Sequence, residues 1–246
     1  MKRLNWQISL AFLLVLLSTI LYFIHYKIFG DVHHIFIYLI GDIAFVPIEV
    51  LLVTLIIHRL LEVREKRILL KKMNMVIGTF FSEVGTTLLK MISEFDEQSE
   101  TIRKTLVVTA EWTDKAFSAT SKRIKGYDST INLGKGNLES LKHFLKDKRG
   151  FLLGLLENQN LLEHETFTDL LWAVFHATDE LVLRKDINNL SHNDAEHIVV
   201  DIKRAYSLLI TEWLAYMEHL RQDYPFLFSL AMRTNPFDPS ATPEIK

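Results

Sequence analysis

The sequence contains no cysteine in its 246 residues. This absence excludes disulfide bonds, thiolate metal ligands and cysteine nucleophiles. It also fits a folded part that stays in the cytosol, where disulfides are rare. Proline is scarce as well: three of the five prolines lie in the segment 234–246, so few of them interrupt the helices expected before it.

Motifs of known enzyme classes are missing too. The tripeptide Gly134-Lys135-Gly136 lacks the surrounding residues of a phosphate-binding loop, and the chain has no Gly-x-Ser-x-Gly motif. We therefore expect a protein that is not an enzyme, with no catalytic residues and no cofactor.

The charge differs between the two ends of the chain. Residues 1–72 contain nine Lys and Arg and five Asp and Glu, a net charge of +4, whereas residues 73–246 have a net charge of −6. A nucleic-acid-binding domain needs a concentrated basic surface. The acidic part of the chain therefore argues against a nucleic acid as a partner.

Two long apolar runs precede this acidic part. The first, Ile8–Ile24, follows Lys2 and Arg3, as the apolar core of a secretory signal would. No small residues follow it at the spacing of a cleavage site. We therefore expect a retained transmembrane helix over residues 5–28.

The second run, Ile35–Ile57, also has the length of a bilayer span, so residues 1–62 are predicted to form a transmembrane hairpin. The segment 29–34 between the runs has no Lys or Arg. Six basic residues follow the second run: Arg59, Arg64, Lys66, Arg67, Lys71 and Lys72. Because cytoplasmic segments are enriched in Lys and Arg, we expect a multi-pass protein of the cell membrane with both termini in the cytoplasm. We also expect these basic residues to contact anionic lipid of the bilayer.

Two acidic residues, Asp42 and Glu49, lie inside the second run. An ionised side chain at the centre of a transmembrane helix costs about 2.5–3.5 kcal/mol, so it usually has a partner or a function. The spacing of seven residues puts both acids on one face of a helix, and Pro47 between them frees a backbone carbonyl. In an oligomer these groups would line a pore and bind a hydrated cation.

A structural role for the two acids is the alternative. If the helix lies one turn lower in the bilayer, Asp42 reaches the outer interface, and Glu49 is either protonated or bonded to Ser18 or Thr19 of the first span. Both interpretations predict a homo-oligomer, because one hairpin has too little surface to shield two acids from lipid.

The rest of the sequence is typical of an all-α protein. Apolar residues recur at steps of three and four along one stripe: Met73, Ile77, Phe80, Val84, Leu88, Met91 and Phe95. They predict a juxtamembrane connecting helix over residues 63–95, followed by a cytosolic helical bundle over residues 96–233. Gly78, Ser82 and Gly85 form a small-residue face on the connecting helix, where we expect another helix to pack.

Residues that cap helices indicate where several of them begin or end. Thr166-x-x-Asp169 and Ser191-x-x-Asp194 resemble capping boxes and are predicted to open two helices. Gly126 is expected to end an earlier helix.

Glycine and proline set the other expected boundaries. A helix beginning near Asn137 is predicted to break or bend at Gly150, and Pro225 is predicted to stop or kink the last long helix. The proline-rich segment 234–246 is expected to be an extended tail. Its tripeptide Asn235-Pro236-Phe237 is either a short docking motif or a proline turn.

Histidines near carboxylates are the candidates for a metal site. Three such groups occur: His164 between Glu163 and Glu165, His176 with Asp179, and Asp194 with His197. Di-iron helical bundles need two Glu-x-x-His motifs and two further Glu, and this chain has no Glu-x-x-His. We therefore expect no metal site, with His176 partly buried beside a hydrogen-bond partner and the other histidines on solvated faces.

Two classes of function remain open. In the first, the hairpin anchors a non-catalytic helical domain that binds a partner or self-associates. In the second, the protein is an oligomeric cation channel or transporter lined by the second span. A membrane-bound metal enzyme would need converging ligands that the sequence does not display.

Overall fold

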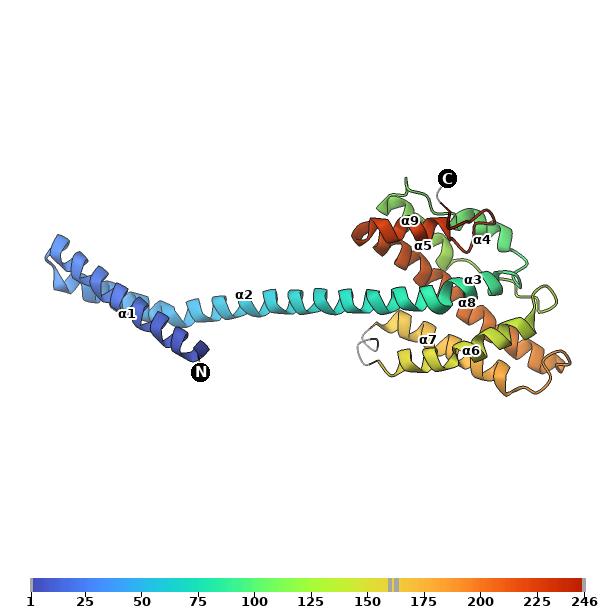
Figure 1. The fold of residues 1–246 in the computed structure, drawn as a ribbon. Helices are drawn as coiled ribbons and strands as arrows, with labels where there is room; N and C mark the ends of the chain where they lie inside the picture. Colours follow the sequence, from blue (N-terminus) through green and yellow to red (C-terminus); the bar gives the residue numbers. More distant parts are fainter. Residues whose placement is uncertain (1, 159–160, 162–163, 245–246) are drawn as a thin grey trace. The chain divides into compact units, whose positions relative to one another are not determined.

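The protein is described from a computed structural model that covers residues 2–158, 161 and 164–244, without the side chains of 2–5, 7 and 67–71. The described residues form an all-α protein with no β-strand (Figure 1). The chain divides into two compact units, Met1–Lys66 and Arg67–Lys246. The all-α prediction is confirmed.

The N-terminal unit consists of two helices joined by a tight turn. α1 spans Lys2–Phe29, and α2 begins at Val32 and continues to Phe80, so that its last part belongs to the second unit. Gly30 makes the turn with φ +63°, a conformation that L-residues with a side chain rarely adopt. Asp31 then caps α2, because its Oδ1 accepts the backbone N–H of His33 at 2.8 Å.

Both helices of this unit are long and apolar enough to cross a membrane. The apolar parts are Ile8–Phe29, with 22 residues, and Val32–Lys66, with 35 residues. α2 continues through Pro47 without a break. A third apolar stretch, Lys72–Ser93, also has the length of a span, but it is partly buried within the second unit.

The second unit is a helical domain built around α8. In chain order its remaining elements are the π-helical turn η1 (Phe81–Gly85), α3 (Thr86–Ser93), α4 (Ser99–Leu106), α5 (Asp114–Lys125), α6 (Leu138–Leu156), α7 (Glu165–Leu183), α8 (His192–Asp223) and α9 (Pro225–Arg233). α8 packs against α3, α5, α7 and α9, and α6 packs against α7 and α3 (Figure 1).

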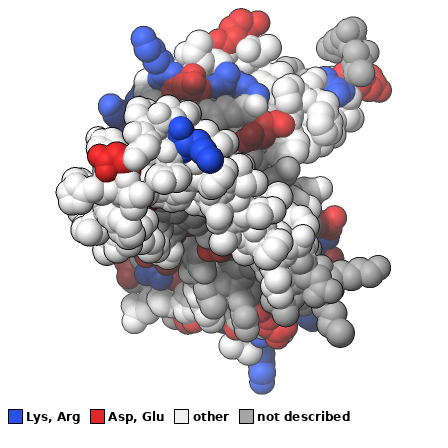
Figure 2. All heavy atoms as spheres, turned by 90° about the vertical axis from the view of Figure 1, so that its left-hand side faces the viewer, with Lys and Arg blue, Asp and Glu red and all other residues white. Residues whose placement is uncertain are grey.

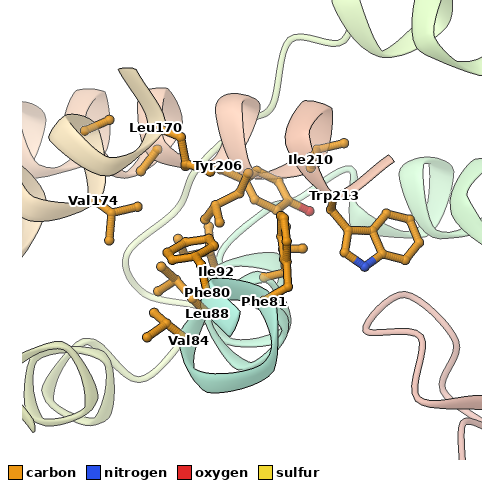
Figure 3. Packing of buried hydrophobic residues seen from close by; sticks show 14 of the residues in the cluster. Phe80, Phe81, Val84, Leu88, Ile92, Leu170, Val174, Tyr206, Ile210 and Trp213 are labelled. Atoms are coloured by element: carbon orange, nitrogen blue, oxygen red, sulfur yellow. The ribbon is translucent and has the colours of Figure 1, made fainter. Parts of the chain in front are cut away.

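The predicted apolar stripe enters the core of this domain. Six of its seven residues are buried, and Met91 is partly buried. Where α2 meets the π-helical turn, the consecutive rings of Phe80 and Phe81 both lie in the core (Figure 3). Phe80 meets Phe167 of α7 at 5.3 Å, and Phe81 stacks on Tyr216 of α8 at 5.1 Å.

The predicted small-residue face meets another helix at Gly78, whereas Ser82 is exposed. A Cβ at Gly78 would meet the Tyr216 ring of α8 at 3.5 Å, which is ordinary van der Waals contact. Gly85 is tighter, because a Cβ there would lie 2.5 Å from the Phe81 ring. The absence of a side chain at Gly85 therefore makes room for the ring of Phe81.

The helix boundaries agree with the sequence in part. Ser191 caps α8 through Asp194 N–H at 3.2 Å, and Gly126 follows α5, as predicted. The break expected at Gly150 is wrong, because α6 runs through it without interruption. The capping box expected at Thr166 is also wrong, since α7 begins one residue earlier, at Glu165.

The segment after α9 is not the extended tail that its composition suggested. Asn235 and Phe237 are buried. The Asn235 side chain donates a 2.8 Å hydrogen bond to the carbonyl of Leu106, at the end of α4, and the Phe237 ring meets Trp213 of α8 at 5.1 Å. The tripeptide 235–237 is therefore part of the core, and in this fold it is not available as a docking motif.

Candidate functional site

The two acids of the second apolar run, Asp42 and Glu49, both lie on α2. Asp42 and Glu49 are exposed, and no hydrogen bond or ion pair to either occurs among the described residues. The alternative in which Glu49 bonds to Ser18 or Thr19 is not seen among the described residues, and the Thr19 hydroxyl donates to the carbonyl of Val15 at 2.9 Å instead. The structure thus places both acids two turns apart on one helix, on either side of Pro47.

The apolar side chains of this unit are largely exposed within it. None of the apolar parts of α1 and α2 within residues 8–66 is buried. Large side chains such as Phe12, Phe23 and Phe45 are more than half exposed. The space-filling view shows a broad area of uncharged atoms on the face toward the viewer, with few Lys, Arg, Asp or Glu side chains in it (Figure 2). α1 and the first part of α2 thus present apolar side chains on their surface.

The predicted basic segment is exposed where it is described. The side chains of Arg59, Arg64, Lys66 and Lys72 are on the surface. Arg59 has one partner, Glu62, at 3.4 Å. The side chains of Arg67 and Lys71 lie outside the described residues. Contact of this segment with lipid stays a prediction.

A cluster of histidines and carboxylates lies between α7 and α8. The Nε2 atoms of His176 and His197 lie 3.3 Å and 3.4 Å from the same oxygen, Oδ2 of Asp201. The three ligand atoms all lie within 4.8 Å of one another. Glu180 lies beside them, with Oε1 4.0 Å from His176 Nε2 and Oε2 3.7 Å from His197 Nε2. We call these four residues the α7–α8 cluster.

An arginine holds the edge of the α7–α8 cluster in place. Arg184 bonds to Oε2 of Glu180 and, at 3.1 Å, to Oδ1 of Asp194. The bond from Arg184 lowers the pKa of the Glu180 carboxyl. The pKa of Asp194 is lowered as well, first by its bond to the Ser191 hydroxyl and then by Arg184. The N-terminal cap of α8 is thereby linked to the cluster.

His176 and His197 were candidates from the sequence, but the carboxylates expected beside them, Asp179 and Asp194, are not part of the cluster. Asp179 is bound by Arg149 at 2.9 Å instead of by His176. The carboxylates beside the histidines are Glu180 and Asp201, which follow His176 and His197 by four residues rather than three. The spacing His-x-x-x-carboxylate was the available signal, but it occurs once on α7 and three times on α8, so it does not select these residues by itself.

Two histidines also differ in exposure from what was expected. The His176 side chain, expected to be partly buried, is exposed, with 47% of its surface accessible. His164, expected on a solvated face, is half-buried, and its Nδ1 accepts the backbone N–H of Phe167 to cap α7. Its neighbour Glu163 lies outside the described residues.

A cavity of about 620 Å³ lies elsewhere in the helical domain. It is lined by the end of α2, by η1 and by parts of α8 and α9, with mostly apolar walls. His219 supplies polar atoms there: its Nδ1 lies 3.2 Å from Asn74 and 2.9 Å from Asp223.

Comparisons with known proteins find two matching family models. The model described as "MJ1433, N-terminal helical domain" matches residues 2–61, and that of the C-terminal helical domain of the same protein matches residues 69–233. The curated "Uncharacterized protein MJ1433" of Methanocaldococcus jannaschii is 48% identical over 234 residues, which cover 95% of this chain and 94% of that protein. No solved structure matches. The gap between the two family models contains the boundary between the two compact units.

Proposed function

The chain belongs to the MJ1433 family, and we propose that it is a two-pass protein of the cell membrane with a non-catalytic helical domain in the cytoplasm. One observation carries this proposal: among the described residues, no apolar side chain of α1 or of the first part of α2 is buried, and most are exposed. Exposed apolar area on this scale is unfavourable in water and favourable in a bilayer.

The orientation follows from the distribution of basic residues. Lys2 and Arg3 precede α1, and basic residues follow the apolar part of α2, whereas the turn at Gly30 and Asp31 has no Lys or Arg. The positive-inside rule then puts both termini on the cytoplasmic side. The non-catalytic role is supported by the lack of nucleophile and phosphate-binding motifs in the sequence.

Self-association is the second part of this proposal. Asp42 and Glu49 have no partner within the described residues, and an unpaired acid facing lipid is costly. Contact between copies of α2 would give each acid a polar partner and remove it from lipid. The helical domain would then be displayed as an oligomer.

The absence of native cysteine makes the topology directly testable. We expect Val32→Cys, next to the turn, to react with a membrane-impermeant maleimide in intact cells, and Lys135→Cys, on the helical domain, to react only after permeabilisation. Leu14→Cys, in the middle of α1, is the matched control and should stay unlabelled in both conditions. Labelling of Lys135→Cys in intact cells would indicate that the helical domain lies outside the cell. Labelling of Leu14→Cys as fast as Val32→Cys would contradict a membrane-spanning α1.

A cation channel is the second candidate, and the two acids on one helix face favour it. If copies of α2 surround a pore, Asp42 and Glu49 form two acidic rings that attract cations. We expect Asp42→Asn or Glu49→Gln to change cation flux into liposomes without changing assembly. Wild-type protein that conducts nothing, or variants that conduct like wild type, would exclude the pore.

A further inference from the structure

The α7–α8 cluster has the dimensions of a metal site. Around a tetrahedral ion with bonds of about 2.0–2.1 Å, neighbouring ligand atoms lie about 3.3 Å apart. The distances from Asp201 Oδ2 to the two imidazole Nε2 atoms are 3.3 Å and 3.4 Å. An ion can therefore bind all three atoms with small movements of exposed side chains.

A second, independent observation concerns Asp201 itself. Its side chain is 4% exposed, and its Oδ2 is buried without a hydrogen-bond partner. The nitrogens of His176 and His197 are near this oxygen, but neither donates a hydrogen bond to it. A buried carboxylate oxygen without a donor is costly, and a bound cation would satisfy it.

We propose that His176 of α7 and His197 and Asp201 of α8 bind one divalent transition-metal ion. Glu180 lies at the edge of the site as a fourth ligand through Oε1, since Arg184 holds the other oxygen, Oε2. The bond from Arg184 to Oε2 fixes the orientation of the Glu180 carboxylate, as hydrogen-bond partners of metal ligands commonly do. Water reaches the site from outside, because His176 and His197 are 47% and 51% exposed.

The ligand set selects the class of ion. Two imidazoles with one or two carboxylates suit Zn²⁺ and the related first-row ions Co²⁺ and Ni²⁺. Mg²⁺ and Ca²⁺ are disfavoured because they prefer oxygen ligands alone. Ions that prefer thiolate ligands, such as Cu(I), are disfavoured because the chain has no cysteine. The site joins α7 to α8, so an ion bound only in the folded state stabilises this pair of helices. This inference is independent of the membrane topology proposed above.

The experiment uses the full chain, purified in detergent and stripped of metal with a chelator. We expect Zn²⁺ titration to give one ion per chain and to raise the melting temperature, and Co²⁺ to give the visible absorption of a tetrahedral site. His176→Ala and His197→Ala should each weaken Zn²⁺ binding by at least about a hundredfold and abolish the rise in melting temperature. Both side chains are half exposed, so these variants are expected to fold.

His192→Ala is the matched control. His192 lies on α8, as His197 does, and pairs with Glu196, the carboxylate four residues later, at 3.4 Å. Its side chain is 85% exposed and lies outside the cluster. This variant should bind Zn²⁺ like wild type. Asp201→Asn, which keeps the shape of the buried side chain, should lose binding as the histidine variants do. Three results would each overturn the proposal. The wild type could fail to bind one Zn²⁺ per chain, or His176→Ala and His197→Ala could bind Zn²⁺ with the affinity of the wild type. The third is a loss of Zn²⁺ affinity in His192→Ala as large as that in the His176 and His197 variants.

Discussion

Replacing Phe237 by alanine is expected to lower the free energy of unfolding of the helical domain by about 3–5 kcal/mol. The Phe237 ring is completely buried and lies edge-on to Trp213 of α8 at 5.1 Å. Removing it leaves a cavity between the C-terminal segment and α8, and the lost contacts are not replaced by water. Urea unfolding of the full chain in detergent, followed by far-ultraviolet circular dichroism, measures the difference.

Phe226→Ala is the control for this experiment. Phe226 lies nearby on α9 but is 71% exposed, so its removal should change the free energy of unfolding by less than about 0.5 kcal/mol. If both variants unfold like wild type, the segment 234–244 does not contribute to the folded domain. A loss confined to Phe237→Ala would instead show that the proline-rich segment is part of the core.

This segment illustrates what sequence patterns leave out. Three prolines within 234–246 exclude a helix, and that inference is sound. The inference that the segment is free of the domain does not follow. Asn235 and Phe237 are held by Leu106 and Trp213, which lie far away in the sequence, and local composition carries no information about such partners.

The same distinction applies to the rest of the fold. The two apolar runs, the stripe from Met73 to Phe95 and the cap at Ser191 follow local rules of hydrophobicity, periodicity and hydrogen bonding, and they were predictable. The π-helical turn was not predictable, because it depends on the packing of Phe80 and Phe81 against α7 and α8. The burial of Asp96 was not predictable either. Its carboxylate accepts 3.1 Å hydrogen bonds from the backbone N–H groups of Gln98 and Thr130.

The α7–α8 cluster shows most clearly that a sequence pattern does not determine which side chains meet across two helices. Spacings of three and of four residues both bring a carboxylate near a histidine on a helix, so the sequence alone offered Asp179 and Glu180 equally to His176. The choice depends on which side of α7 faces α8. Once the two helices pack, Glu180 and Asp201 face the histidines, while Asp179 faces Arg149 of α6.

The acids of the hairpin give the second large expected effect, on assembly rather than on folding. Replacing both Asp42 and Glu49 by leucine should weaken self-association in liposomes by about 2–4 kcal/mol, if each acid contributes about 1–2 kcal/mol through polar contacts between helices. This corresponds to a roughly 30- to 700-fold change in the dissociation constant. Energy transfer between labelled copies, measured as the protein is diluted in lipid, gives this constant.

Two further variants separate polar contact from charge and from helix face. The double variant Asp42→Asn with Glu49→Gln keeps groups that hydrogen-bond between helices, so it should retain most of the association. Thr54→Leu changes a polar residue on another face of α2, because Thr54 lies five residues after Glu49 and five residues turn a helix by about 140°. This variant should associate like wild type. Wild-type association in the double leucine variant would contradict contact between copies through the acids. Equal weakening by Thr54→Leu would show that leucine acts through general hydrophobicity, and the acids would then have no specific role in assembly.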